Sequence, residues 1–186
     1  MPSRFVTQVL TACMLALFAL APLAAPAEAK SAREIDAGVN DTLQRFYQTV
    51  PSGFDLERRA AAVLVFPTIV KAGIGVGGEY GEGALRINGR TVDYYNSISA
   101  SIGFQLGAQA RSVIIMFMTP EALRSFRRKA GWKVGVDGSV TLINVGAGGA
   151  IDTNTVTQPV IGFILDQKGL MYNLTLEGSK ISRIKR

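Results

Sequence analysis

An amphipathic helix is predicted over residues 30–47 by apolar positions that recur at spacings of four, four and three, namely Ile35, Val39, Leu43 and Phe46. This spacing forms one stripe on a helix surface. Pro51-Ser52-Gly53 ends the helix, and residues 55–62 favour a short second one. The stripe has two interpretations. It docks on the rest of the domain as core, or it lies in a bilayer interface while Arg33 and Arg45 reach the headgroups.

Strand-like runs separated by turn residues replace the helical pattern after residue 62. Asn88-Gly89 separates two such runs and predicts a β-hairpin, because both central residues of a type I′ turn need a positive φ. Asp137-Gly138 predicts a second hairpin for the same reason. Further strands are expected over residues 62–66, ended by Pro67, and over 160–165 and 170–176, joined by a turn at 166–169.

One helix interrupts this strand-rich half of the chain. Thr119 is a suitable N-cap, Pro120 suits the first helical position, and Gly131 favours a left-handed end. The apolar stripe of this helix comprises Ala122, Leu123, Phe126 and Ala130.

Glycines recur inside the strand-like runs between residues 71 and 151. Glycine within a strand marks a tight bend, a bulge or the close approach of another backbone. Gly73, Gly75 and Gly78 also match the dinucleotide-binding pattern GxGxxG, but that site needs a helix directly after the glycines, and residues 79–83 are typical of strand or turn. We therefore predict an α+β fold: a glycine-rich curved antiparallel β-sheet or small barrel, with an N-terminal helical segment and one inserted helix.

Residues 1–29 have the pattern of a secretory signal peptide. Arg4 precedes an uncharged apolar run over residues 9–23, and Ala27-Glu28-Ala29 matches a signal-peptidase site. The run of about 15 residues is shorter than the roughly 20 that span a bilayer. We expect cleavage after Ala29 and a periplasmic or envelope-associated protein. Residues 10–13 also resemble a lipoprotein motif ending at Cys13, but a cut there would leave the apolar run on the protein, so the cut after Ala29 is favoured.

Composition restricts the function further. The 186 residues suffice for one domain, and 20 Lys and Arg against 14 Asp and Glu give a net charge of +6. We expect anionic phospholipid, glycan phosphate or an acidic envelope protein as partner, and no nucleic acid.

The chain has no His, and its single Cys lies in the signal peptide. The commonest general base, thiol nucleophiles and the usual zinc ligands are therefore missing, and we expect no enzyme, cofactor or metal. The acids Glu79, Glu82 and Asp137 leave a hydrolase as an alternative, although they can equally pair with the surplus cations.

Basic residues concentrate on the predicted helix that follows Thr119 and at the C-terminus. Spacings of three and four place cations on one helix face, opposite the apolar stripe. Such a face either contacts phosphate headgroups or is simply solvated. The headgroup candidates are Arg124, Arg127, Arg128, Lys129, Lys133, Lys180, Arg183 and Lys185.

Several motifs, in order along the chain, resemble the SYLF domain, a lipid-binding family of bacteria and eukaryotes. They are AVLVFP at residues 62–67, GVGGEYGEG at 75–83, SASIGFQLGAQ at 99–109, WKVGVDGSV at 132–140 and GLMYNLTLEGS at 169–179. The resemblance extends from about residue 56 to the C-terminus. Together with the patterns described above, it divides the chain into a signal peptide (1–29), an N-terminal helical segment (30–62) and a SYLF-like domain (56–186).

The resemblance implies phospholipid binding without enzymatic activity. Eukaryotic relatives are linked to phosphoinositides, membrane remodelling and actin, but for an exported protein we expect only the lipid-binding role. Those relatives use a basic N-terminal segment, whereas residues 30–62 here mix basic and acidic residues without a positive excess. The expected function is a phospholipid-binding and membrane-binding protein of the bacterial cell envelope, acting by apolar contact plus Arg and Lys pairing with phosphates. The alternative is a structural envelope protein that binds a protein or peptidoglycan through its basic face.

Overall fold

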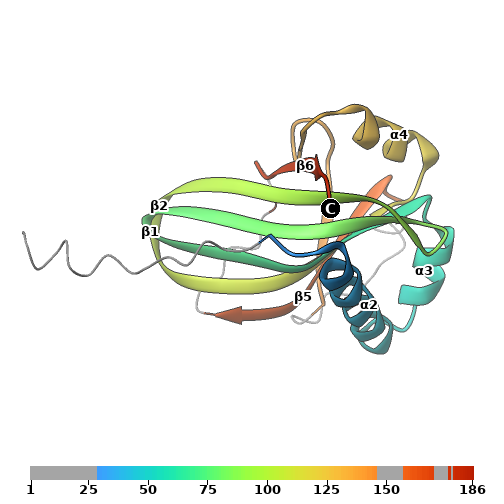
Figure 1. The fold of residues 1–186 in the computed structure, drawn as a ribbon, viewed down its shortest axis with the longest axis horizontal. Coiled ribbons are helices and arrows are strands. Elements are labelled where there is room, and N and C mark those ends of the chain that lie inside the picture. Colours follow the sequence, from blue (N-terminus) through green and yellow to red (C-terminus); the bar gives the residue numbers. More distant parts are fainter. Residues whose placement is uncertain (1–28, 146–156, 170–175, 177) are drawn as a thin grey trace, which may run out of the picture.

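A long β-hairpin organises the computed structural model, which describes residues 29–145, 157–169, 176 and 178–186 (Figure 1). Strands β1 (Ala62–Ile87) and β2 (Arg90–Phe117) pair antiparallel, from Ala62 opposite Phe117 to Ile87 opposite Arg90. Asn88 and Gly89 form the turn with φ angles of 51° and 74°, as the sequence predicts. The GxGxxG glycines lie inside β1, so the helix that a dinucleotide site requires does not follow them.

This hairpin turns back on itself at the end remote from the helices, so that one half of β1 lies against the other (Figure 1). Gly81 and Gly83 form the contact. A Cβ atom at Gly81 would lie 2.8 Å from the carbonyl oxygen of Thr68, and one at Gly83 would overlap the carbonyl oxygen of Val65. Only residues without a Cβ atom permit this approach. The predicted role of glycine in a curved sheet is thereby confirmed at these two positions.

Pro67 does not end the first strand, and that prediction was wrong. β1 continues through Pro67 with a shift of register between Phe66 and Ile69. Proline lacks the N–H group that a regular ladder needs, and an irregularity of the ladder is one of the places where it is tolerated. The residue therefore bends the strand instead of terminating it.

The other edge of β2 carries two further strands. β6 (Lys180–Ile184) pairs with its first part and β5 (Val160–Gly169) with its last part, both antiparallel. β3 (Trp132–Lys133) adds to β6, and β4 (Thr141–Asn144) adds to β5 in parallel. The α+β class and the curled sheet are confirmed, but the sheet is mixed because of the parallel pair.

The predicted hairpin at Asp137-Gly138 is wrong, because β3 and β4 pair with different strands. The segment between them makes a local turn instead. Gly135 has a φ of 85°, and the carboxylate of Asp137 accepts a hydrogen bond from the backbone N–H of Lys133 at 2.8 Å. A side chain that accepts a hydrogen bond from the backbone of a residue a few positions away stabilises a turn without requiring paired strands.

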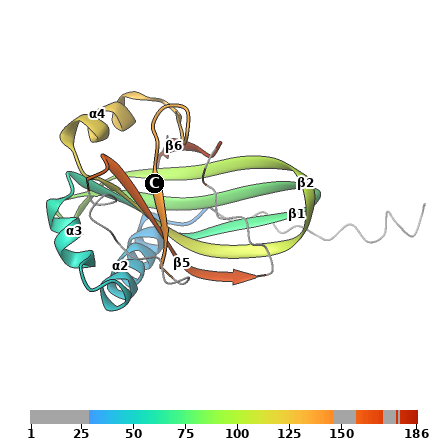
Figure 2. The same cartoon turned by 180° about the vertical axis from the view of Figure 1, so that it is seen from behind.

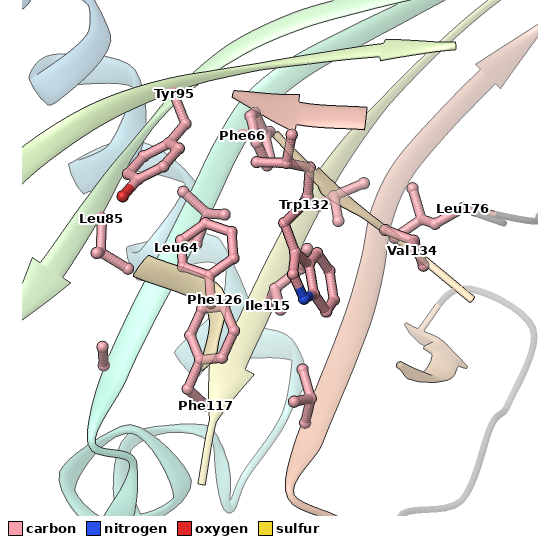
Figure 3. Close-up of a cluster of buried hydrophobic side chains, with 14 of the residues drawn as sticks. Leu64, Phe66, Leu85, Tyr95, Ile115, Phe117, Phe126, Trp132, Val134 and Leu176 are labelled. Atoms are coloured by element: carbon pink, nitrogen blue, oxygen red, sulfur yellow. The ribbon is translucent and has the colours of Figure 1, made fainter. Parts of the chain in front are cut away.

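Aromatic side chains fill the space between the two halves of the hairpin (Figure 3). The Phe126 ring lies 4.7 Å from Phe117, 5.0 Å from Tyr95 and 5.6 Å from Trp132, measured between centroids. Phe126 comes from helix α4 (Pro120–Arg128), which closes one end of this inner core. Thr119 caps the helix as predicted, but the helix ends at Arg128, before Gly131, and Ala130 is exposed.

Helix α2 (Ala32–Thr49) packs on the outer face of the sheet, followed by the short α3 (Gly53–Arg59). Its apolar stripe is buried, with exposures of 1%, 0%, 4% and 0% for Ile35, Val39, Leu43 and Phe46. The stripe therefore serves as core, and the structure does not place these four residues at a membrane. The helix begins with a capping box between Ser31 and Glu34.

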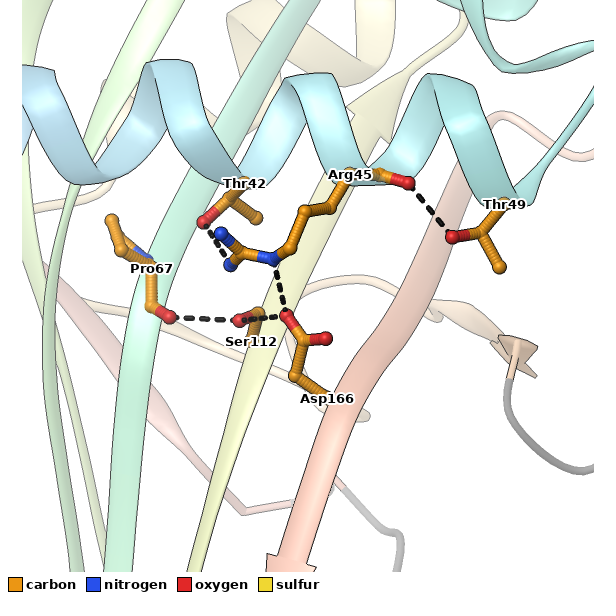
Figure 4. Close-up of polar contacts among 6 residues, drawn as sticks. All are labelled: Thr42, Arg45, Thr49, Pro67, Ser112 and Asp166. Atoms are coloured by element: carbon orange, nitrogen blue, oxygen red, sulfur yellow. Dashed lines mark hydrogen bonds and ion pairs between the residues drawn. The ribbon is translucent and has the colours of Figure 1, made fainter.

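A polar network ties α2 to three strands (Figure 4). The Arg45 guanidinium lies 2.9 Å from the Asp166 carboxylate. The Ser112 hydroxyl, which lies 3.2 Å from that carboxylate, also lies 2.8 Å from the carbonyl oxygen of Pro67. Asp166 has a φ of 54° beside a register shift, and β5 continues to Gly169, so the turn predicted at 166–169 is wrong. The strand predicted at 170–176 lies almost wholly outside the described residues.

Among the described residues, no helix has both the length and the apolar character needed to span a bilayer.

Replacing Gly83 by alanine should destabilise the domain by about 1–3 kcal/mol, because the added methyl group overlaps the backbone of Val65. Urea unfolding measures this change. Gly78→Ala is the matched control in the same strand, since the nearest atom there lies 3.9 Å away. Equal stabilities of the two variants would contradict the close packing of the two halves of β1.

Phe46→Ala should lower the free energy of unfolding by about 3–5 kcal/mol, because the ring is fully buried and lies 4.8 Å from the ring of Phe163. Gln44→Ala, at an exposed position of the same helix, should change it little. A Phe46→Ala variant as stable as the parent would mean that α2 does not dock on the sheet in solution.

Candidate functional site

Cations from α4 and β6 meet beside the N-terminal part of β2, and Figures 1 and 2 both show α4 and β6 on the same side of the molecule. The Asp93 carboxylate joins them. It lies 3.3 Å from the guanidinium of Arg127 on α4 and 3.3 Å from that of Arg183 on β6. One acid thus holds two arginines that are far apart in the sequence, and both remain about half exposed, at 42% and 53%.

A second acid organises the lysines next to α4. The ammonium group of Lys129 lies 3.2 Å from Asp137, whose carboxylate also accepts the backbone N–H of Lys133. These two contacts hold the pKa of Asp137 below its usual range, with the backbone hydrogen bond the larger cause. Lys133 is paired with Lys180 across β3 and β6.

Five of the eight predicted headgroup residues are therefore linked by contacts or strand pairing: Arg127, Lys129, Lys133, Lys180 and Arg183. We call these five the cationic face. Two acids, Asp93 and Asp137, contact it, so positive charge remains in excess. Arg124 is exposed and pairs with Glu121 on its own helix, and Arg128 and Lys185 are exposed. The structure does not link these three to the cationic face.

Val136 projects from the turn between Lys133 and Asp137 with 77% of its surface exposed. Its neighbours in the turn are fixed by the hydrogen bond from the Lys133 N–H to Asp137. Sequence reasoning treated this segment as a hairpin and assigned it no role. The result is an exposed apolar side chain in the turn that joins Lys133 to Asp137, the partner of Lys129.

Sequence reasoning also missed a buried polar cluster between the two halves of the hairpin. Arg111 and Glu79 form an ion pair at 2.7 Å with side-chain exposures of 1% and 3%. Lys71 and Gln109 are buried beside them, at 7% and 2%. Burial raises the pKa of Glu79, and the charges of Arg111 and Lys71 oppose this rise. The available signal was the polar residues at alternate positions 109 and 111, directly before the apolar positions 113, 115 and 117.

The three acids considered for a hydrolase each contact a cation. Glu79 pairs with Arg111, Asp137 with Lys129, and Glu82 with Arg186. Glu82 also accepts the backbone N–H of Lys30 at 3.2 Å. In the part of the chain that the structure describes, no group of three or more acidic residues is arranged to hold a metal ion.

Comparison with known proteins gives one family. Residues 98–186 match the sequence model of Ysc84, described as "Las17-binding protein actin regulator". No curated protein matches the chain. The matched residues contain most of β2, all of α4, and β3 to β6, and therefore every member of the cationic face. Through residues 98–186, this match assigns the chain to the SYLF domain family.

Proposed function

We propose that this protein binds anionic phospholipid surfaces of the cell envelope through the cationic face, with Val136 entering the lipid interface. The observation that carries the proposal is the position of this exposed valine, 77% accessible, within a turn whose neighbouring lysines are positively charged. A surface that combines apolar insertion with cations is the usual composition of a peripheral membrane site.

Electrostatics favours this surface as the first contact. Each Lys or Arg near an anionic membrane contributes on the order of 1 kcal/mol, and the attraction declines within a Debye length of about 10 Å at 0.1 M salt. The five cations of the cationic face approach a membrane together, while Asp93 and Asp137 fix their positions. Binding should therefore weaken steeply as salt is added.

We also propose that a signal peptide exports the protein to the periplasm and is cleaved there, so that the mature chain begins at Lys30. The matched family's description names a protein partner and actin regulation. An envelope protein or peptidoglycan bound by the same cationic face is accordingly the competing function. We further propose that binding involves no catalysis.

Replacing Arg127 and Lys129 together by glutamine should weaken binding to phosphatidylglycerol-containing vesicles roughly 30-fold, because two cations of the cationic face are lost. Co-sedimentation with vesicles at low and high salt measures this change. Phosphatidylcholine vesicles should bind the parent and the variant equally weakly.

The matched control for this experiment is Arg58→Gln with Arg59→Gln. These residues are likewise two exposed cations at the C-terminal end of a helix, α3, which lies apart from α4 in Figures 1 and 2. The control removes the same charge at another place. If both double variants lost binding equally, net charge and not the cationic face would be responsible. If the parent bound neither vesicle, the competing function would be favoured.

Val136→Ser should lower the affinity for the same vesicles about tenfold without changing its dependence on salt, because it removes apolar contact and no charge. Vesicle titrations at several salt concentrations separate the two effects. An affinity unchanged by this substitution would limit the interaction to electrostatics and contradict the insertion of Val136.

A further inference from the structure

The carboxylate of Glu82 receives contacts from three separate parts of the chain. Its Oε1 atom accepts a hydrogen bond from the Tyr80 hydroxyl at 2.5 Å and contacts the guanidinium of Arg186, which follows β6. Its Oε2 atom accepts the backbone N–H of Lys30 at 3.2 Å. The segment before α2, the hairpin and the C-terminal segment therefore meet at one acid.

Glu82 lies inside the fold, whereas its charged partners lie at the surface. The Glu82 side chain is 3% exposed, against 17% for that of Arg186, and Lys30 is an exposed residue. A buried carboxylate is strongly unfavourable unless cations or hydrogen-bond donors compensate it. Cations that approach from the solvent side keep part of their own hydration, so Glu82 can accept a second cation besides Arg186.

The position of Glu82 is the point where the two halves of β1 meet. It lies between Gly81 and Gly83, at which the second half of the strand approaches the first. Beside it is a pocket of about 520 Å³ whose lining comes from the segment before α2 and from both halves of β1, namely Ala29, Lys30, Thr68, Val70, Tyr80, Gly81 and Glu82. A group bound to Glu82 in this pocket touches both halves of the doubled hairpin.

We propose that Glu82 binds the ammonium group that cleavage after Ala29 creates on Lys30, so that processing fixes the start of the mature chain to the doubled hairpin. This ion pair rests on the cleavage proposed above, because before cleavage the same nitrogen is a neutral amide of the Ala29–Lys30 peptide bond. After cleavage it carries a positive charge at neutral pH and has three N–H groups instead of one. The 3.2 Å contact then becomes an ion pair with a buried carboxylate, which solvent screens less than a surface pair.

The same contact determines where α2 starts against the sheet. Ser31, the N-cap of this helix, directly follows Lys30 and forms the capping box with Glu34. An N-terminus held on Glu82 therefore also holds the first turn of α2 beside the hairpin. The mature chain gains this attachment and the precursor lacks it, so removal of the signal peptide completes the fold.

Insertion of Gly-Ser between Ala29 and Lys30 of the full-length chain tests the ion pair. Cleavage after Ala29 then leaves an ammonium group of the same charge two residues away from its position in the parent, and the mass of the exported protein confirms where each chain begins. The insertion should lower the melting temperature of the parent by about 3 °C. In Glu82→Gln the same insertion should lower it by less than about 1 °C, because the carboxylate is already absent.

The matched control is Asp41→Asn, which removes an exposed acid from α2. The insertion should lower the melting temperature in this background as much as in the parent. An equal loss in Glu82→Gln, or no loss in the parent, would overturn the proposal.

Reactivity of the N-terminal amine gives a second readout that does not depend on the folding of Glu82→Gln. Only the unprotonated amine is acylated, and an ion pair favours the protonated form. At neutral pH the amine of Lys30 in the parent should therefore react about tenfold more slowly than the N-terminal amine of the insertion variant, after each rate is divided by that of the unfolded chain. Mass spectrometry of the N-terminal peptide measures both rates. Equal corrected rates would refute the ion pair.

Failure of this site and failure of membrane binding are distinguishable. A mass that places the mature N-terminus anywhere but at Lys30 rejects the ion pair, whatever the vesicle experiments show. Vesicle binding through Arg127 and Lys129 together with an insertion that leaves the melting temperature unchanged also rejects the ion pair alone. The predicted dependence on Glu82 in a protein that binds no vesicles supports the ion pair and rejects membrane binding.

Discussion

The close approach of Gly81 and Gly83 to the backbone of Val65 and Thr68 is the constraint on which the rest of the structure depends. It allows the β1–β2 hairpin to double over and enclose an inner core. The edge of β2 that does not pair with β1 pairs with β6 along its first part and with β5 along its last part. The outer face then receives α2, whose buried stripe completes a second core. A methyl group at either glycine would separate the layers.

The parts of this fold that rest on local chemistry could be predicted from the sequence. Periodicity predicted α2, the Thr119 cap predicted α4, and Asn88-Gly89 predicted the hairpin turn. Predictions failed where a local signal competes with long-range pairing. Pro67 suggests the end of a strand and residues 166–169 suggest a turn, yet in both places the strand continues through an irregularity of the ladder. The chain does turn just before Gly138, with its positive φ at Gly135, but the strands on either side, β3 and β4, pair with other strands.

The two polar regions differ in how far sequence could predict them. The cationic face follows from helical spacing and a basic C-terminus, although the roles of Asp93 and Asp137 in fixing it required the folded chain. The cluster of Lys71, Glu79 and Arg111 could not be predicted, because it forms only when the halves of one hairpin face each other. The apolar stripe of α2 was predicted correctly, but its role was not determined by the sequence. The same amphipathic pattern suits a membrane surface or a protein core, and here tertiary packing buries it in the core.

The doubled hairpin is tested most directly by nuclear Overhauser contacts in solution across the fold of β1. The account predicts cross-peaks between the α-protons of Gly81 and the side chain of Ile69, and between those of Gly83 and the ring of Phe66. A straight hairpin would instead show only contacts between directly paired residues of β1 and β2, such as Gly83 with Tyr95. Observing those ladder contacts without the contacts across β1 would contradict the account.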